Sequence, residues 1–257
     1  HFGLTCYASG IFAAQAYLGH PSFARLLSVV RNPLNVPRAT GQRVFVRHGG
    51  AWRQLGVPSA FAMTPGDARW LYRFGDDVVE LRAACSPTCP AERLQLNVLS
   101  GAPREFLISH ELIVGALEFE HPIQAEVFRD HGWVGLRPSG KSLVGQYLPG
   151  VCFAIAATDP ADIAEIGGEN LLLADGAGQA GPYLVLQTRP VTRCGVLLLG
   201  CAAGWSALAA AVETARTAFA GTPLPARPLP APVRFAGADA GIGRLDAILP
   251  WFAHNAA

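Results

Sequence analysis

The motif with the most specific chemistry is the run G-x-x-x-x-G-K-S at residues 135–142. In a nucleotide-binding loop of this spacing, backbone N–H groups hold the phosphates and the lysine reaches the terminal ones. Such a loop follows a buried strand and opens a long helix, but Gly145 and Pro149 leave no room for three helical turns after Lys141. The motif is therefore interpreted as a solvated hairpin loop, and a P-loop nucleotide binder is kept as an alternative function.

A second group combines carboxylates with histidines, in His110-Glu111 and in the run E-F-E-H at residues 118–121. On a strand, Glu118 and Glu120 would share one face while His121 lies on the other. Paired carboxylates beside histidines could transfer protons to a sugar or bind a metal. The same alternation is also typical of the solvated face of a sheet, so both interpretations stay open.

The third polar group is R-N-P-L-N-V-P-R at residues 31–38, in which Arg31, Asn32 and Asn35 stand on a segment stiffened by prolines. Arginine and asparagine side chains could bind carbohydrate hydroxyls or phosphate. They could equally satisfy the backbone of a buried loop.

Most of the chain up to residue 203 consists of short apolar segments separated by turn residues, and several alternate apolar with polar positions. This pattern predicts strands with one buried face. We expect a mainly β fold built as one large antiparallel β-sandwich. The predicted strands cover residues 43–47, 78–82, 94–99, 105–109, 112–114, 151–155, 183–187 and 195–200.

The pattern changes after residue 203. Residues 205–219 are rich in alanine and predict a helix that ends at Gly221. Five prolines between positions 223 and 232 predict a stiff linker. An apolar, aromatic helix begins near residue 244, and its companions would have to come from further sequence. The predicted divisions are a sandwich at 1–203, a linker helix and proline-rich strap at 204–232, and the start of a helical domain at 233–257.

Composition excludes several classes of function. The 257 residues carry 20 Lys+Arg and 19 Asp+Glu without a basic run, so a nucleic-acid partner is not expected. The sequence contains no apolar run of 18 residues, so no membrane-spanning helix is predicted. The six cysteines lack the spacing of a zinc or redox site, so we expect no metal site and interpret them as thiols of a cytoplasmic protein.

Five stretches resemble the N-terminal region of the β-1,2-oligoglucan phosphorylases of glycoside hydrolase family 94, which are related to cellobiose phosphorylases and to the phosphorylase-like end of cyclic β-1,2-glucan synthases. They are FARLLS at 23–28, RNPLN at 31–35, GQRVF at 41–45, GVPSAF at 56–61 and LPWFAHNA at 249–256. The resemblance implies a β-supersandwich similar to galactose mutarotase, a linker helix, and an (α/α)6 barrel whose first helix begins near the end of this chain.

By the same resemblance, the parent reaction is reversible phosphorolysis of β-1,2-linked glucose oligomers to α-glucose 1-phosphate, with inversion. An aspartic acid protonates the glycosidic oxygen while inorganic phosphate, the co-substrate, attacks in place of water. That aspartate lies downstream in the family, so no catalytic residue is expected in this chain, which alone should be inactive. Trp251, His254 and Asn255 are carried over as substrate contacts, although Trp251 could also be a core aromatic.

The preferred interpretation is thus the non-catalytic N-terminal part of a longer phosphorylase. Its expected partners are a β-glucan oligosaccharide and the barrel of the parent chain, with a homo-oligomer contact also open, and no cofactor is expected. A stand-alone carbohydrate-binding β-sandwich that uses the face around residues 118–121 remains the first alternative. The short helix at 245–257 is expected to pack on the sandwich or to fray.

Overall fold

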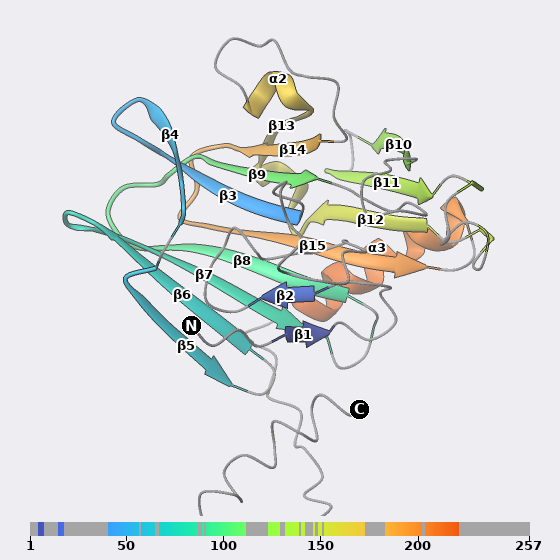
Figure 1. Cartoon of the computed structure of the whole chain (residues 1–257), viewed down its shortest axis with the longest axis horizontal. Coiled ribbons are helices and arrows are strands. Elements are labelled where there is room, and N and C mark those ends of the chain that lie inside the picture. Colours follow the sequence, from blue (N-terminus) through green and yellow to red (C-terminus); the bar gives the residue numbers. More distant parts are fainter. Residues whose placement is uncertain are drawn as a thin grey trace, which may run out of the picture.

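A computed structural model shows two antiparallel sheets stacked on each other and one long helix against the larger sheet (Figure 1). It describes residues 5–7, 15–17, 41–56, 58–64, 67–86, 89, 91–111, 123–128, 132–138, 140–141, 146, 149–150, 152–172, 183–201 and 204–220. A short separate pair is formed by β1 (Thr5–Tyr7) and β2 (Gln15–Tyr17).

The larger sheet has eight strands in the order β10-β11-β12-β15-β8-β7-β6-β5. Every neighbouring pair in it is antiparallel. Its strands are β5 (Ala60–Thr64), β6 (Asp67–Phe74), β7 (Asp77–Cys85), β8 (Ala91–Ser100), β10 (Ile123–Phe128), β11 (Trp133–Pro138), β12 (Cys152–Ala157) and β15 (Arg193–Cys201).

The smaller sheet has five strands in the order β13-β14-β9-β3-β4, also antiparallel. They are β3 (Gly41–His48), β4 (Ala51–Gln54), β9 (Phe106–Glu111), β13 (Ile163–Gly167) and β14 (Tyr183–Thr188). The short helices η4 (Pro160–Asp162) and α2 (Glu169–Leu172) flank β13.

The predicted antiparallel sandwich is confirmed, and seven predicted strands overlap observed ones. The eighth, 112–114, lies outside the described residues.

Alternation of side chains along β8 explains how the layers are held together. Leu94 and Leu96 face the smaller sheet and join its Val44 and Ile108 in one buried core. The residues between them face the other way, and among these Arg93 contacts the long helix. A strand of period two can therefore serve two buried layers at once.

The long helix is α3 (Trp205–Phe219), as predicted, and it packs against β15 and β12. Its buried residues are Leu208, Val212, Ala215 and Phe219, spaced as one apolar helical face. The C-cap residue is Ala220, and the predicted cap Gly221 lies outside the described residues. The predicted domain divisions remain predictions.

Arginines of the larger sheet fix both ends of α3. At the first turn, the Arg137 guanidinium lies 4.3 Å from the ring centre of Trp205. At the last turn, Arg93 Nη1 donates to the Phe219 carbonyl at 3.1 Å, and its guanidinium lies 5.0 Å from the Phe219 ring. A cation is favourable there because carbonyls at a helix C-terminus lack partners within the helix.

The turn after β8 depends on a glycine. Gly101 has a φ of 110°, and a methyl group on it would overlap the Asp77 carboxylate. Gly101→Ala should therefore lower the free energy of unfolding by about 1–3 kcal/mol, measured by urea denaturation. Gly56→Ala is the matched control, since Gly56 has open space and no positive φ. Equal stability of the two variants would contradict the requirement for glycine at position 101.

Arg93 gives a second prediction. Arg93→Met keeps an unbranched, flexible stem in the buried position but leaves the Phe219 carbonyl without its donor, so the free energy of unfolding should fall by about 1–3 kcal/mol. Arg193→Met removes an exposed arginine from the neighbouring strand and should change stability by less than about 0.5 kcal/mol. An unchanged free energy of unfolding in Arg93→Met would show that Arg93 does not stabilise the docked helix.

Candidate functional site

The six residues predicted to contact substrate, Arg31, Asn32, Asn35, Trp251, His254 and Asn255, all lie outside the described residues. So does the acidic run at 118–121. Their roles therefore stay predictions. Two other polar groups from the sequence, the G-x-x-x-x-G-K-S run and His110, have described positions.

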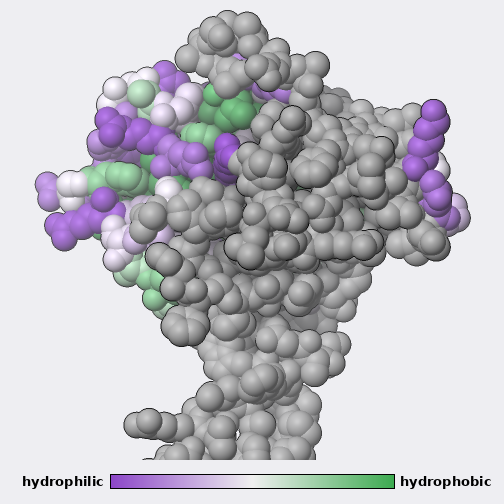
Figure 2. Space-filling view, in the orientation of Figure 1, coloured by the Kyte–Doolittle hydropathy of each residue, from purple (hydrophilic) through white to green (hydrophobic). Residues whose placement is uncertain are grey.

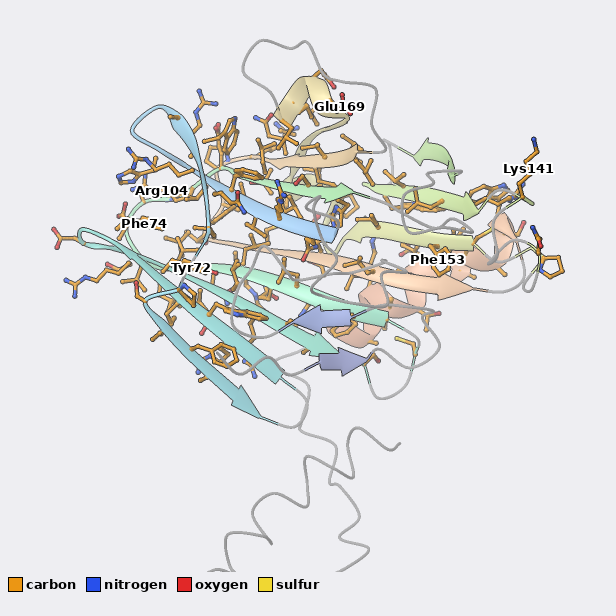
Figure 3. The ribbon with its side chains drawn as sticks, viewed as in Figure 1. Tyr72, Phe74, Arg104, Lys141, Phe153 and Glu169 are labelled. Carbon is orange, nitrogen blue, oxygen red and sulfur yellow. The ribbon has the colours of Figure 1, made fainter. Side chains whose placement is uncertain are left out.

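The first half of the G-x-x-x-x-G-K-S run is a β-strand in an antiparallel sheet. Gly135 and Arg137 belong to β11, which pairs antiparallel with β10 on one side and β12 on the other. Lys141 follows in an exposed turn and projects from the rim of the sandwich (Figure 3). Its carbonyl accepts a hydrogen bond from Gln146 Nε2 at 2.9 Å. A phosphate-binding loop belongs to a parallel βαβ unit, so this surrounding argues against the nucleotide-binding alternative.

His110 is fully buried on β9, where it faces the interior of the sandwich. The amide nitrogen of Gln42, its cross-strand partner on β3, lies 2.8 Å from His110 Nε2. With the amide donating, Nε2 accepts and the ring proton sits on Nδ1, which makes no hydrogen bond. Burial lowers the pKa of His110 to about 3. The ring is therefore neutral at physiological pH.

Glu92 is a second buried ionisable residue whose pKa is strongly shifted. It precedes Leu94 and Leu96 on the same face of β8 and is 1% exposed. Its ladder neighbours are Leu198 and Cys85, and its Oε2 makes no hydrogen bond. Burial raises the pKa of Glu92 to about 8, so the carboxyl is protonated at pH 7.

Chain connectivity places the interior polar residues at one end of the sandwich. β8 passes through residues 101–105 directly into β9, so the end of β8 and the start of β9 lie together. Glu92 is the second residue of β8, and His110 is the second-to-last residue of β9. Both therefore lie at the opposite end, together with Gln42, the second residue of β3.

This interior group lacks the access that acid–base catalysis requires. A glycosidic acid must reach the leaving oxygen, usually across from a second carboxylate or a bound nucleophile. Glu92 has the raised pKa of such an acid, but burial alone causes the shift and the carboxyl faces packed core. We interpret Gln42, Glu92 and His110 as structural polar residues.

The end of the sandwich near residues 101–105 is held by charged contacts between the sheets. Asp77 on β7 forms an ion pair with Arg104, and His48 Nδ1 on β3 lies 4.0 Å from Asp77 Oδ2. The rings of His48 and Phe74 are 5.8 Å apart. Figure 3 shows Arg104 and Phe74 at this end, where the hairpins project. Sequence reasoning missed this cluster because its members are distant in the chain.

The described stretches show neither a metal site nor a membrane helix. Among their side chains, no group of three or more His, Cys, Asp or Glu could hold a metal ion. None of the helices they contain is long and apolar enough to cross a membrane.

Glu92 makes stability depend on pH. Its pKa is higher in the folded state than the ordinary 4.5, so its contribution is fully present below pH 4.5 and is lost as pH rises through about 8. The natural protein should lose stability between pH 5.5 and 8.5, and Glu92→Gln should not. The difference in unfolding free energy between the two proteins should therefore shift by about 1–3 kcal/mol in favour of Glu92→Gln over this range. Urea denaturation at several pH values measures this difference. The contribution of His110 cancels because both proteins contain it. A difference independent of pH would contradict the assignment.

Comparison with known proteins agrees with this architecture. Residues 2–199 match the model of the glycoside phosphorylase supersandwich domain. A 1,2-beta-oligoglucan phosphorylase of Listeria innocua serovar 6a is 23% identical over 177 residues, which are 69% of this chain and 16% of that protein. The chain therefore spans less than a fifth of the length of this curated relative.

A solved polysaccharide lyase shares 10% identity and a TM-score of 0.44, over 79% of this chain and 32% of that one. This likeness is too low to carry an argument. The family match covers most of the residues, and the two stacked antiparallel sheets have the form of a supersandwich. The resemblance to glycoside phosphorylases is confirmed, and the chain belongs to the glycoside phosphorylase supersandwich domain family.

Proposed function

We propose that this chain is the supersandwich part of a glycoside phosphorylase that acts on β-1,2-linked gluco-oligosaccharides. The observation that carries the proposal is the family match over residues 2–199. The relative from Listeria innocua, named a 1,2-beta-oligoglucan phosphorylase, supports the substrate class. The reaction is reversible phosphorolysis to α-glucose 1-phosphate with inversion, and inorganic phosphate is the co-substrate.

In this proposal the sandwich itself is not catalytic. An inverting phosphorylase needs an acid that reaches the glycosidic oxygen. The acid with the most suitable pKa in the described part, Glu92, is shut inside the core. In line with the family resemblance, we assign the proton to an aspartate in another part of the protein and give the sandwich the role of a rigid support. The proposed setting is the cytoplasm, without an organic cofactor.

A supporting role fits the mechanical character of the domain. Its core joins both sheets and α3 in one apolar cluster. The Asp77–Arg104 ion pair joins the sheets at one end, and arginines hold the helix at both termini. Such packing keeps attached surfaces in fixed positions, as catalysis of an oriented displacement requires. The remainder of the protein is the proposed partner, and a homo-oligomer contact is compatible with this role.

The test is a phosphorolysis assay on the product of the complete reading frame. With a β-1,2-linked gluco-oligosaccharide and inorganic phosphate, the protein should release glucose 1-phosphate, and NMR should assign the α anomer. A β-1,3-linked oligosaccharide of equal length is the control and should react far more slowly. The 257-residue chain alone should release none. No phosphorolysis of the β-1,2-linked substrate by the complete protein would refute the proposal, and product release by the chain alone would contradict the non-catalytic role.

A further inference from the structure

The hairpin of β3 and β4 carries a polar and aromatic surface that none of the roles above uses. Its cross-strand pairs, Phe45 with Gln54 and Arg47 with Trp52, place these four side chains on one face. The opposite face holds Val44 and Val46, which are buried in the core. We call the outward set, together with Glu105, the hairpin platform.

The hairpin platform lies at a projecting part of the molecule. In Figure 1 the β3–β4 hairpin extends beyond the ends of β9 and β14. Figure 2 shows hydrophilic residues with hydrophobic ones between them over the region where the hairpins project. β4 is an edge strand of the five-stranded sheet, so ligand could approach this face from the side. Phe45 and Trp52 are half-buried, and Arg47 and Gln54 are exposed.

Contacts within the platform hold its central arginine in place. The Arg47 guanidinium lies 5.4 Å from the centre of the Trp52 ring. Its Nη1 lies 3.4 Å from Glu105 Oε2, and its backbone N–H donates to the Glu105 carbonyl at 3.0 Å. An ion pair and a ring contact together reduce the number of arginine conformations, so less entropy is lost when a ligand binds.

The chemistry of the platform selects a class of ligand. Arg47 and Glu105 neutralise each other, which disfavours a phosphate or another anion. An indole and a phenyl ring offer apolar faces, while guanidinium, carboxylate and amide groups offer hydrogen bonds around them. An uncharged ligand with one apolar face and many hydroxyls uses both kinds of group, and a pyranose ring has this form.

We propose that the hairpin platform of Phe45, Arg47, Trp52, Gln54 and Glu105 binds a gluco-oligosaccharide chain. The choice of a β-1,2-linked glucan rests on the proposed function. The site holds part of a longer substrate against the supersandwich. Trp52 supplies the apolar contact, and the Arg47–Glu105 pair supplies hydrogen bonds to hydroxyls on the ring edge.

Calorimetric titration of the complete protein with a linear β-1,2-linked gluco-oligosaccharide tests this site. The inorganic phosphate is omitted so that no turnover occurs. Trp52→Ala should raise the dissociation constant of the platform at least tenfold, and Trp52→Phe should restore most of the lost affinity. Retention of the same affinities in Trp52→Ala would overturn the inference, and so would the absence of any heat from the natural protein.

Matched controls separate binding from folding. Phe61→Ala removes an exposed aromatic residue on β5 of the other sheet and should leave binding and phosphorolysis unchanged. Circular dichroism and thermal unfolding check that Trp52→Ala is folded, and Arg47→Met, which should also weaken binding, provides a second variant if it is not. Binding that both variants leave intact would overturn the inference.

The phosphorolysis assay distinguishes this inference from the proposed function. A protein that releases glucose 1-phosphate but binds oligosaccharide independently of Trp52 contradicts the platform alone. A protein that binds through Trp52 without releasing product supports the platform and contradicts the proposed reaction. The two ideas can therefore fail separately.

Discussion

The structure depends on the two-sided burial of strand β8. One of its faces must be apolar enough to complete the core between the sheets, through Leu94 and Leu96. The other face must accommodate α3 beside polar neighbours, through Arg93 and Gln95, which are also buried. A register shift of one residue would exchange these faces and bury Arg93 between the sheets, at a large desolvation cost. The alternation along β8 therefore fixes the sheet, the core and the helix together.

The sequence predicted local features better than the surroundings of single residues. Helix α3 was predicted to its ends because alanine content and apolar spacing are properties of one segment. Strand β6 was missed, although Trp70 and Tyr72 alternate there with Arg69 and Arg73, a pattern that could have revealed it.

Interior contacts were beyond such reasoning. Gln42 and His110 meet across 68 positions because β3 and β9 pair in one register, and a single sequence does not specify that register. Nothing near Glu92 in the sequence indicates that both faces of its strand are covered, so its raised pKa could not be predicted. The sequence gives the type of each residue, whereas its burial depends on how the two sheets and the helix pack together. The predicted substrate contacts at 31–35 and 251–255 lie outside the described residues.

The arginine at the end of α3 also has a geometric consequence. Arg93 ties the carbonyl of Phe219 to a central strand of the larger sheet, so the last helical turn has a defined position and axis. The backbone of Ala220 still has helical geometry. The C-terminal end of α3 is therefore held at a fixed point on the larger sheet. Because Arg137 holds the first turn as Arg93 holds the last, α3 cannot tilt on the sheet without breaking one of these two contacts.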